Sequence, residues 1–246
     1  AVVVAPLQAI NADNDEVGIT VTAPAELSTT EGGGTDSFTL VLESQPVSNV
    51  DIQIESSDIT EVTVSSAEVT FTSKNWNVPQ TVTVTGQDDA VQDGNQSYTV
   101  TVGPVSGDPL YAAIDPADLA GSNVDDETAD IVVNPTSGLV TTEDGPGSAS
   151  FTVVLSSMPT SDVTVTLGSD DSSEGTTDVG SLTFTNANWD TAQTVTVTGA
   201  DDVLQDGDVA YNVVLDPATS TDVNYSGFDA NAVSVRNVDN ETAPVI

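Results

Sequence analysis

The sequence predicts an all-β chain made of two tandem, seven-stranded, immunoglobulin-like sandwiches. Three observations support this prediction: a long internal duplication, short runs that alternate Val, Thr, Ile and Phe with polar residues, and no helical periodicity over a useful length. Alternating runs are typical of half-buried antiparallel strands, and about seven of them in roughly 110 residues indicate an immunoglobulin-like sandwich.

The duplication covers nearly all of the 246 residues. The segment FTSKNWNVPQTVTVTG, from Phe71, recurs as FTNANWDTAQTVTVTG, from Phe184, so that Trp76 and Trp189 are 113 positions apart. We therefore expect one repeat over residues 16–127 and a second over 128–246. Residues 1–15 overlap the segment LQAINADNDEVGI, from Leu7 to Ile19, which resembles the closing segment VSVRNVDNETAPV. They are expected to be either the last strand of a preceding repeat or an N-terminal extension.

The strands are placed by the alternation itself. In the second repeat they are expected near Ile131–Val133, Ser150–Leu155, Val163–Leu167, Leu182–Thr185, Thr194–Thr198, Ala210–Leu215 and Val233–Arg236. The Trp and Tyr that recur within each duplicated block are expected to anchor the core.

The charge balance excludes several function classes. The chain has 39 Asp and Glu against two Lys and Arg, for a net charge of −37, and it has no Cys and no His. Nucleic acid and anionic membrane surfaces are excluded as partners because both need basic residues. Disulfides, Cys or His metal sites and the usual general base are also excluded. There is no nucleophile elbow, P-loop or dinucleotide motif, so we expect no enzyme. Oxygen ligands remain, and they suit Ca²⁺ or, less well, Mg²⁺.

Strand direction brings many of the acidic residues to one end of each repeat. If consecutive strands alternate in direction, five separate segments deliver acids to the same pole. In repeat one these are Glu31, Asp58, Asp88 with Asp89, Asp93, and Asp125 with Asp126. In repeat two they are Glu143, Asp170 with Asp171, Asp201 with Asp202, Asp206, and Asp239. Each acid alone could be a turn or a solvated residue. Together, and duplicated, they favour calcium, because closely spaced carboxylates repel one another unless a cation lies between them.

A family resemblance rests on one block of sequence. The pattern TFT-x-x-NW, followed by TVTVTG-x-DD-x-x-x-DG-x-x-x-Y, is present in both repeats and resembles the Calx-beta family. It looks most like the tandem repeats of large secreted bacterial surface proteins and adhesins. The resemblance implies a seven-stranded sandwich with calcium at one pole. It assigns metal ligation to Glu31, Asp58, Asp88, Asp89, Asp93, Asp125, Asp126, Glu143, Asp170, Asp201, Asp202, Asp206, Asp239 and Asn240.

Two departures from the family pattern reduce the expected number of ions. The third consecutive Asp of the exchanger proteins is Ala90 or Val203 here, and a later acid is Gln96 or Val209. We therefore expect one or two ions in each repeat.

The function expected from these features is an extracellular calcium-binding structural repeat that rigidifies a bacterial surface protein or adhesin. Its partners would be neighbouring repeats of the same protein. Two alternatives remain open. The apolar segment Ala1–Ile10 could add a strand to a neighbouring molecule and build an extracellular filament. The chain could also be a calcium-sensing regulatory module.

Overall fold

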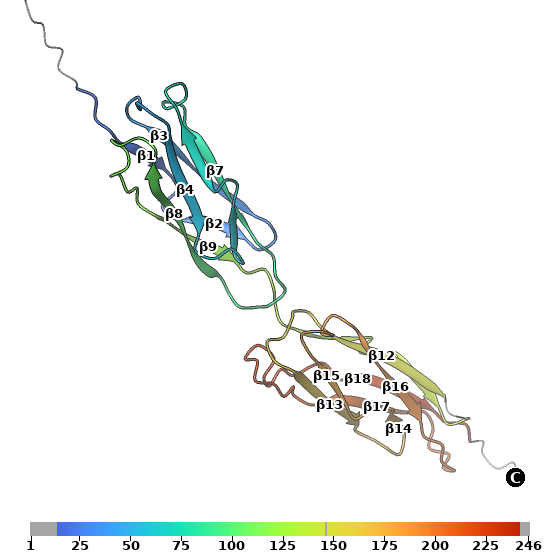
Figure 1. Cartoon of the computed structure of the whole chain (residues 1–246). Coiled ribbons are helices and arrows are strands. Elements are labelled where there is room, and N and C mark those ends of the chain that lie inside the picture. The colour runs from blue at the N-terminus through green and yellow to red at the C-terminus, as the bar shows by residue number, and fades with distance from the viewer. Residues whose placement is uncertain (1–13, 146, 242–246) are drawn as a thin grey trace, which may run out of the picture. The chain divides into compact units, whose positions relative to one another are not determined.

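The computed structural model describes residues 14–145 and 147–241 (Figure 1). Within them the chain forms eighteen strands and no helix, which confirms the predicted all-β fold class. The described residues divide into two compact units, the first made of residues 14–89 and 94–126 and the second of residues 90–93, 127–145 and 147–241. The proposed strand Ala1–Ile10 lies outside the described residues. The described part of the chain contains no helix that is long and apolar enough to cross a membrane.

The first unit is a sandwich of a four-stranded and a five-stranded sheet. The smaller sheet contains β1 (Ile19–Thr22), β3 (Thr35–Leu42), β7 (Gln80–Gly86) and β5 (Val62–Val64), hydrogen-bonded in that order. The larger sheet contains β2 (Leu27–Thr30), β9 (Leu119–Val124), β8 (Gln96–Ser106), β4 (Val50–Ser56) and β6 (Glu68–Phe71), again in that order. All pairs are antiparallel except β2 with β9, which run parallel.

The second unit repeats this topology. Its smaller sheet contains β10 (Ile131–Asn134), β12 (Ser148–Leu155), β16 (Gln193–Gly199) and β14 (Gly175–Thr177). Its larger sheet contains β11 (Leu139–Thr142), β18 (Val233–Val238), β17 (Val209–Leu215), β13 (Val163–Ser169) and β15 (Ser181–Phe184). All seven strands predicted for this repeat are present. The structure adds β11 and β14, each only three or four residues long.

The core of each unit follows from the alternation. Along β12 and β16, Phe151, Val153, Val195 and Val197 are essentially inaccessible to solvent, and the residues between them face outward. Burying one such side chain contributes about 1.5–3 kcal/mol. Trp189 packs against the edge of this core, and Trp76 does the same in the first unit. The sequence therefore specifies which face of each strand is inside.

Candidate metal centre

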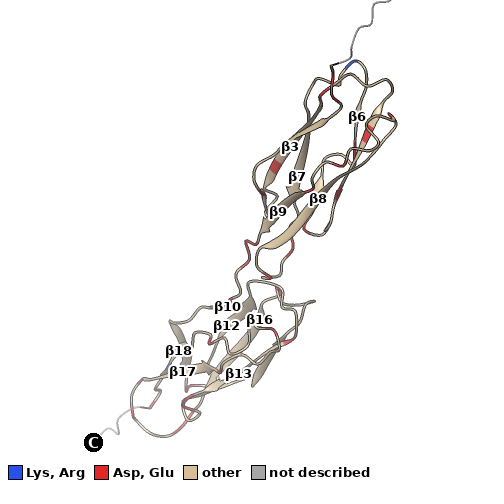
Figure 2. Cartoon of the chain, turned by 90° about the vertical axis from the view of Figure 1, so that its left-hand side faces the viewer, with Lys and Arg blue, Asp and Glu red and all other residues tan. Residues whose placement is uncertain are grey.

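Strand ends meet at one end of the second unit. The Glu143 N–H, just after β11, donates to the carbonyl of Val238 at the end of β18, over 3.2 Å. The Gly207 N–H, in the loop between β16 and β17, donates to Asp239 Oδ2 over 2.7 Å. These contacts bring together three of the five segments that the sequence places at this pole. In Figure 2 the ribbon is coloured red at acidic residues, and several of these lie in the loops at the C-terminal end of this unit.

Three carboxylates of this end form a tight group. Oxygens of Glu143, Asp239 and Glu241 all lie within 4.8 Å of one another, and Glu143 is only 2% exposed. Calcium holds its oxygen ligands at about 2.3–2.6 Å, so two ligands of one ion are at most about 5 Å apart. The spacing of these three groups therefore fits a single ion.

Glu241 carries the clearest sign that a cation belongs here. Its Oε2 atom is buried and has no hydrogen-bond donor among the described residues. Burial, followed by hydrogen bonds and charges from Asp239 and Glu143, raises the pKa of Glu241 to about 7. Within the described residues, no Lys or Arg pairs with these three carboxylates, because Arg236 pairs with Asp208. A buried acceptor without a donor is unfavourable, and a metal ion would satisfy it.

A fourth carboxylate lies beside this group. Glu174, which precedes β14, is 6% exposed, and burial raises its pKa, with smaller contributions from the charges of Asp206, Asp171 and Glu143. The side-chain amide of Asn237, in β18, lies between two of the glutamates. Its Nδ2 donates over 3.4 Å to both Glu143 Oε1 and Glu174 Oε2.

The close approach of Asn237 requires a glycine at the end of β16. A Cβ on Gly199 would lie 2.6 Å from Asn237 Oδ1 and 2.6 Å from the carbonyl oxygen of Thr142. Gly86 has the same relation to Asn123 and Thr30 in the first repeat, at 2.5 Å and 2.1 Å. The glycine that ends TVTVTG in both copies therefore leaves room for the asparagine and the adjoining chain.

The first repeat contains two corresponding groups. Oxygens of Glu31, Asp126 and Glu127 lie within 4.8 Å of one another, and so do oxygens of Glu61, Asp89 and Asp93. Asn123 Nδ2 donates to Glu61 Oε2 over 3.3 Å, as Asn237 does to Glu174. The arrangement of glutamate and asparagine is therefore present twice in the chain.

Several predicted ligands make local hydrogen bonds instead of joining a group. Asp58 accepts from the Thr60 N–H and hydroxyl at 3.0 and 2.6 Å, and these bonds lower its pKa. Asp170 accepts from the Asn212 N–H and Nδ2 at 2.7 and 3.0 Å, which also lowers its pKa. Asp58 therefore caps its own turn, whereas Asp170 ties the loop after β13 to β17.

The remaining predicted ligands lie around the edges of the groups. Asp125 accepts from the Gly94 N–H at 2.5 Å, and Asp202 accepts from the Leu204 N–H at 2.7 Å. Asn240 Nδ2 reaches Asp201 at 3.5 Å, while the Asn240 N–H donates to Glu143 Oε2 at 3.4 Å. Asp88 and Asp206 are exposed, and the negative charge of Asp206 contributes to the raised pKa of Glu174.

Sequence reasoning missed four glutamates that the structure brings into or beside these groups. Glu61 and Glu174 are 113 positions apart, and Glu127 and Glu241 each follow an Asn-Val-Asp-x motif. The duplication itself was the signal, because both pairs recur at equivalent positions.

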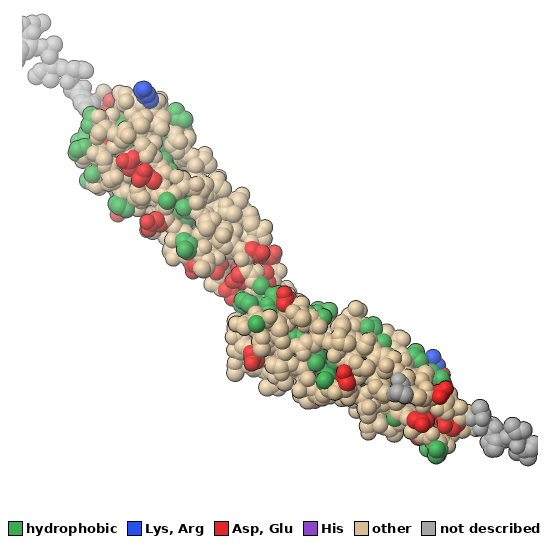
Figure 3. Space-filling view, turned by 45° about the vertical axis from the view of Figure 1, so that its right-hand side comes forward, with side chains coloured by type: hydrophobic (Ala, Val, Ile, Leu, Met, Phe, Trp, Pro, Cys, Tyr) green, Lys and Arg blue, Asp and Glu red, His purple; other side chains and the backbone are tan. Residues whose placement is uncertain are grey.

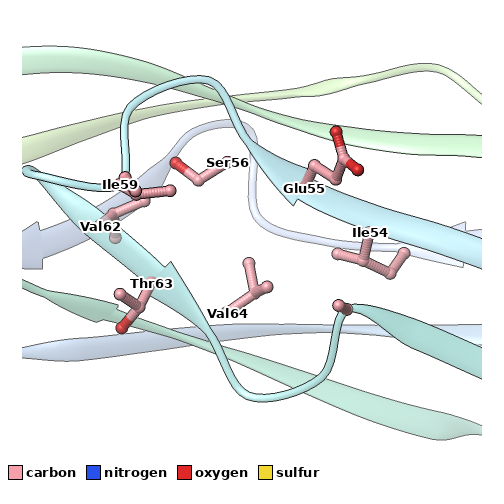
Figure 4. A pocket seen from close by; sticks show the side chains of 8 residues that line it. Ile54, Glu55, Ser56, Ile59, Val62, Thr63 and Val64 are labelled. Atoms are coloured by element: carbon pink, nitrogen blue, oxygen red, sulfur yellow. The ribbon is translucent and has the colours of Figure 1, made fainter.

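A separate pocket lies in the first unit beside β4 and β5 (Figure 4). It has a volume of about 360 Å³ and is lined mainly by aliphatic side chains, among them Ile54, Ile59, Val62 and Val64. In the second repeat the residues equivalent to Ile59 and Val62 are Ser172 and Gly175. The lining includes none of the grouped carboxylates, so we assign the pocket no part in the metal centre.

Comparison with known proteins gives a likeness of architecture. No protein-family model and no curated protein matches the chain. Among solved structures, it is similar to CBD12 from CALX1.2, at 14% identity over 88% of this chain and 99% of that one, with a TM-score of 0.40. The calcium binding domain CBD12 of CALX1.1 is similar at 12% identity over 85% and 96%, with a TM-score of 0.41. The periplasmic chaperone SfaE is similar at 13% identity over 90% and 100%, with a TM-score of 0.34. We transfer no residue role from these structures.

Proposed function

We propose that this chain is an extracellular calcium-binding structural repeat that rigidifies a bacterial surface protein or adhesin. The observation that carries the proposal is the group of Glu143, Asp239 and Glu241, in which a buried glutamate oxygen has neither a donor nor a basic neighbour among the described residues. Such a group is unfavourable alone and becomes favourable with a divalent cation between its oxygens.

The donor set favours calcium over other metals. All the grouped side chains offer carboxylate oxygens, and the chain has no Cys or His to attract zinc or copper. Calcium accepts six to eight oxygens in flexible geometry and uses bidentate carboxylates, whereas magnesium needs a near-ideal octahedron and retains several waters. Extracellular modules bind calcium with dissociation constants of about 10⁻⁴–10⁻³ M, which suits a site that stays loaded outside the cell.

A mechanical role is supported by where the ligands lie in the sequence. Asp126 and Glu127 fall between the end of β9 at Val124 and the start of β10 at Ile131. The linker between the repeats thus consists largely of candidate ligands and their neighbours. A cation held there would remove conformational freedom from the linker, so a string of repeats would stiffen when calcium binds.

Calorimetric titration of calcium into the full chain, with paired thermal melts and small-angle scattering, tests the proposal. We expect saturable binding, a higher melting temperature than in EGTA, and a scattering profile that becomes more extended with calcium. Identical melting curves in calcium and in EGTA would contradict it. Binding that leaves the scattering profile unchanged would favour the calcium-sensing alternative.

A further inference from the structure

The second compact unit includes a short piece of the first repeat. Residues Ala90–Asp93, between β7 and β8 in the sequence, belong to this unit, and Ala90 and Gln92 are half-buried. The piece accepts three hydrogen bonds of 2.6 Å, from Met158 N to the Ala90 carbonyl, from Ala129 N to Gln92 Oε1, and from Asn224 Nδ2 to the Gln92 carbonyl. The tip of a β7–β8 loop is therefore held by a defined set of residues.

The same loop of the second repeat is exposed. Val203–Asp206 follow β16 as Ala90–Asp93 follow β7, at a distance of 113 positions. The glycine after each tip makes the same hydrogen bond: the Gly94 N–H donates to the Asp125 carboxylate, and the Gly207 N–H donates to the Asp239 carboxylate. Val203 is nevertheless 88% exposed and Leu204 is 61% exposed. We name Val203–Asp206 the donor tip.

The first unit carries a counterpart of the surface that holds Ala90–Asp93. In the second unit, Asp222 accepts from the N–H groups of Thr160 and Asn224. In the first unit, Asp108 accepts in the same way from Val47, at 2.7 Å, and from Leu110, at 2.9 Å. Val47 and Leu110 are therefore the counterparts of Thr160 and Asn224.

A third residue completes this surface. The carbonyl of Gly18 accepts from the Glu43 N–H, just as the carbonyl of Asp130 accepts from the Ser156 N–H. The residue before Gly18, Val17, is therefore the counterpart of Ala129, which precedes Asp130. Val17 and Leu110 thus correspond to two residues that hold Ala90–Asp93, and Val47 shares the carboxylate of Asp108 with Leu110. We name Val17, Val47 and Leu110 the acceptor surface.

The donor tip is more apolar than Ala90–Asp93, and the acceptor surface is more apolar than its counterpart in the second unit. The exposed fractions of Val17, Val47 and Leu110 are 42%, 80% and 60%, and they replace Ala, Thr and Asn of the second unit. The donor tip has Val203 and Leu204 where the first repeat has Ala90 and Val91. Contiguous exposed apolar surface marks interaction sites, and these side chains stand at positions equivalent to those of an existing contact. Figure 3 shows such hydrophobic side chains, in green, on the surface of both units.

Charge favours the same pairing. Asp201, Asp202 and Asp208 flank the donor tip. The single lysine of the chain, Lys74, follows Ser73, whose carbonyl accepts from Gln45, the counterpart of Met158, over 3.0 Å. In the second repeat Ala187 stands at the position of Lys74. A basic side chain is thus added beside the acceptor surface alone, where it would face an acidic loop.

We propose that the donor tip of one molecule docks on the acceptor surface of a second copy of this chain. Two different surfaces take part, so each molecule keeps one free donor and one free acceptor. Such a heterologous contact does not close on itself unless a ring forms, and it generates linear arrays. The contact needs no calcium ligand of its own, although calcium at the flanking aspartates would reduce the repulsion between molecules that each carry a charge of −37.

Analytical ultracentrifugation of the full chain tests the proposal. Samples up to about 1 mM are needed, because a single loop tip forms a contact smaller than a standard interface. Two buffers are used, one with calcium and one with EGTA and about 0.5 M NaCl to screen repulsion. We expect the weight-average mass to rise from 25.1 kDa past that of a dimer as concentration increases.

Variants test the two surfaces separately. V203S/L204S removes the apolar donor, and L110D places a carboxylate on the acceptor surface. Each is expected to raise the dissociation constant at least tenfold. An equal mixture of the two should form dimers and no longer species, because one partner keeps its acceptor and the other its donor. V214S, which alters an exposed residue near the end of β17, is the matched control and should associate as the wild type does.

Three results would overturn the proposal: a chain that stays at 25.1 kDa in both buffers, a donor variant that associates as the wild type does, or no dimer in the mixture. Association in EGTA and salt by a chain that does not bind calcium would support this contact while contradicting the calcium-dependent function.

Discussion

Replacing Glu174 with Gln should change the stability of the second unit in opposite directions with and without calcium. Burial raises the pKa of this glutamate, so its charged form is unfavourable in the calcium-free protein. Glutamine has the same shape, carries no charge, and can present its carbonyl oxygen to Asn237 Nδ2. The calcium-free unit should therefore melt at a higher temperature in the variant. With calcium, the variant has lost a charged oxygen at the site and should gain much less.

The size of the calcium effect can be worked from linkage. At a calcium concentration one hundred times the dissociation constant, binding stabilises the folded unit by about 2.7 kcal/mol. Loss of an outer partner of a metal site weakens affinity by about 10–100-fold, and loss of a ligand should do at least as much. A hundredfold weaker site at the same calcium concentration leaves about 0.4 kcal/mol. For a unit of roughly 120 residues, about 3–5 °C corresponds to 1 kcal/mol, so a gain of roughly 8–13 °C should fall to about 1–2 °C.

Each repeat has one tryptophan, which makes the assay specific. In a Trp76→Phe background, Trp189 is the only tryptophan, so fluorescence melts report the second unit alone. Glu61→Gln, the same change in the first repeat, is the matched control and should leave the Trp189 transition unchanged. If Glu174→Gln kept the full calcium-dependent gain, or lowered the calcium-free melting temperature, the placement of Glu174 at a cation site would be refuted.

Three further outcomes follow from the structure. In EGTA the second unit should lose stability as pH rises from about 4.5 to 7, because the raised pKa of Glu241 makes the folded state hold more protons than the unfolded state in that window. The melting temperature should therefore fall across this range in EGTA and not in saturating calcium. In denaturant titrations, Gly199→Ala should destabilise the second unit by about 1–3 kcal/mol, since its Cβ would clash with Thr142 and Asn237. Gly168→Ala is the control, because a Cβ there would have nothing within 4 Å. Tyr225→Phe should destabilise the second unit by about 1–3 kcal/mol, because the buried hydroxyl accepts from the Ser157 N–H at 3.1 Å and donates to the Ser157 carbonyl at 2.8 Å. A change below about 0.5 kcal/mol in the same titrations would contradict this role.

The fold could be predicted from the sequence to a large extent because alternation identifies a strand and its buried face together. The segment from Ile131 to Thr142 illustrates the limit. The sequence predicts a strand only near Ile131–Val133 in this segment, but the chain turns at Pro135–Gly138 and forms a second strand in the other sheet. Its first half, β10, pairs with β12, and its second half, β11, pairs in parallel with β18. Alternation reports that a residue faces the core, and it does not report which of two sheets carries the strand.

The candidate site was harder to predict, for a different physical reason. An aspartate in a loop can accept hydrogen bonds from nearby N–H groups or face a cation, and its spacing in the sequence is the same in both cases. Asp58 satisfies its carboxylate locally, on Thr60, two residues further along the chain. Glu241 leaves a buried oxygen without a donor. The difference lies in burial and in contacts between distant segments, which only the folded chain defines.

The asparagine of β18 explains how such an acidic group can exist in the folded state. The hydroxyl of Thr141 donates to Asn237 Oδ1 over 3.0 Å, which fixes the orientation of the amide and directs Nδ2 toward Glu143 and Glu174. Thr29 and Asn123 form the same contact at 2.8 Å in the first unit. Because the asparagine has no charge, it supplies donors to two buried glutamates without cancelling the negative field that would attract a cation. A lysine at this position would neutralise the site, and an aspartate would add repulsion and remove the donors. A buried amide therefore holds the carboxylates in place without adding a positive charge, which is the arrangement that a structural calcium site requires.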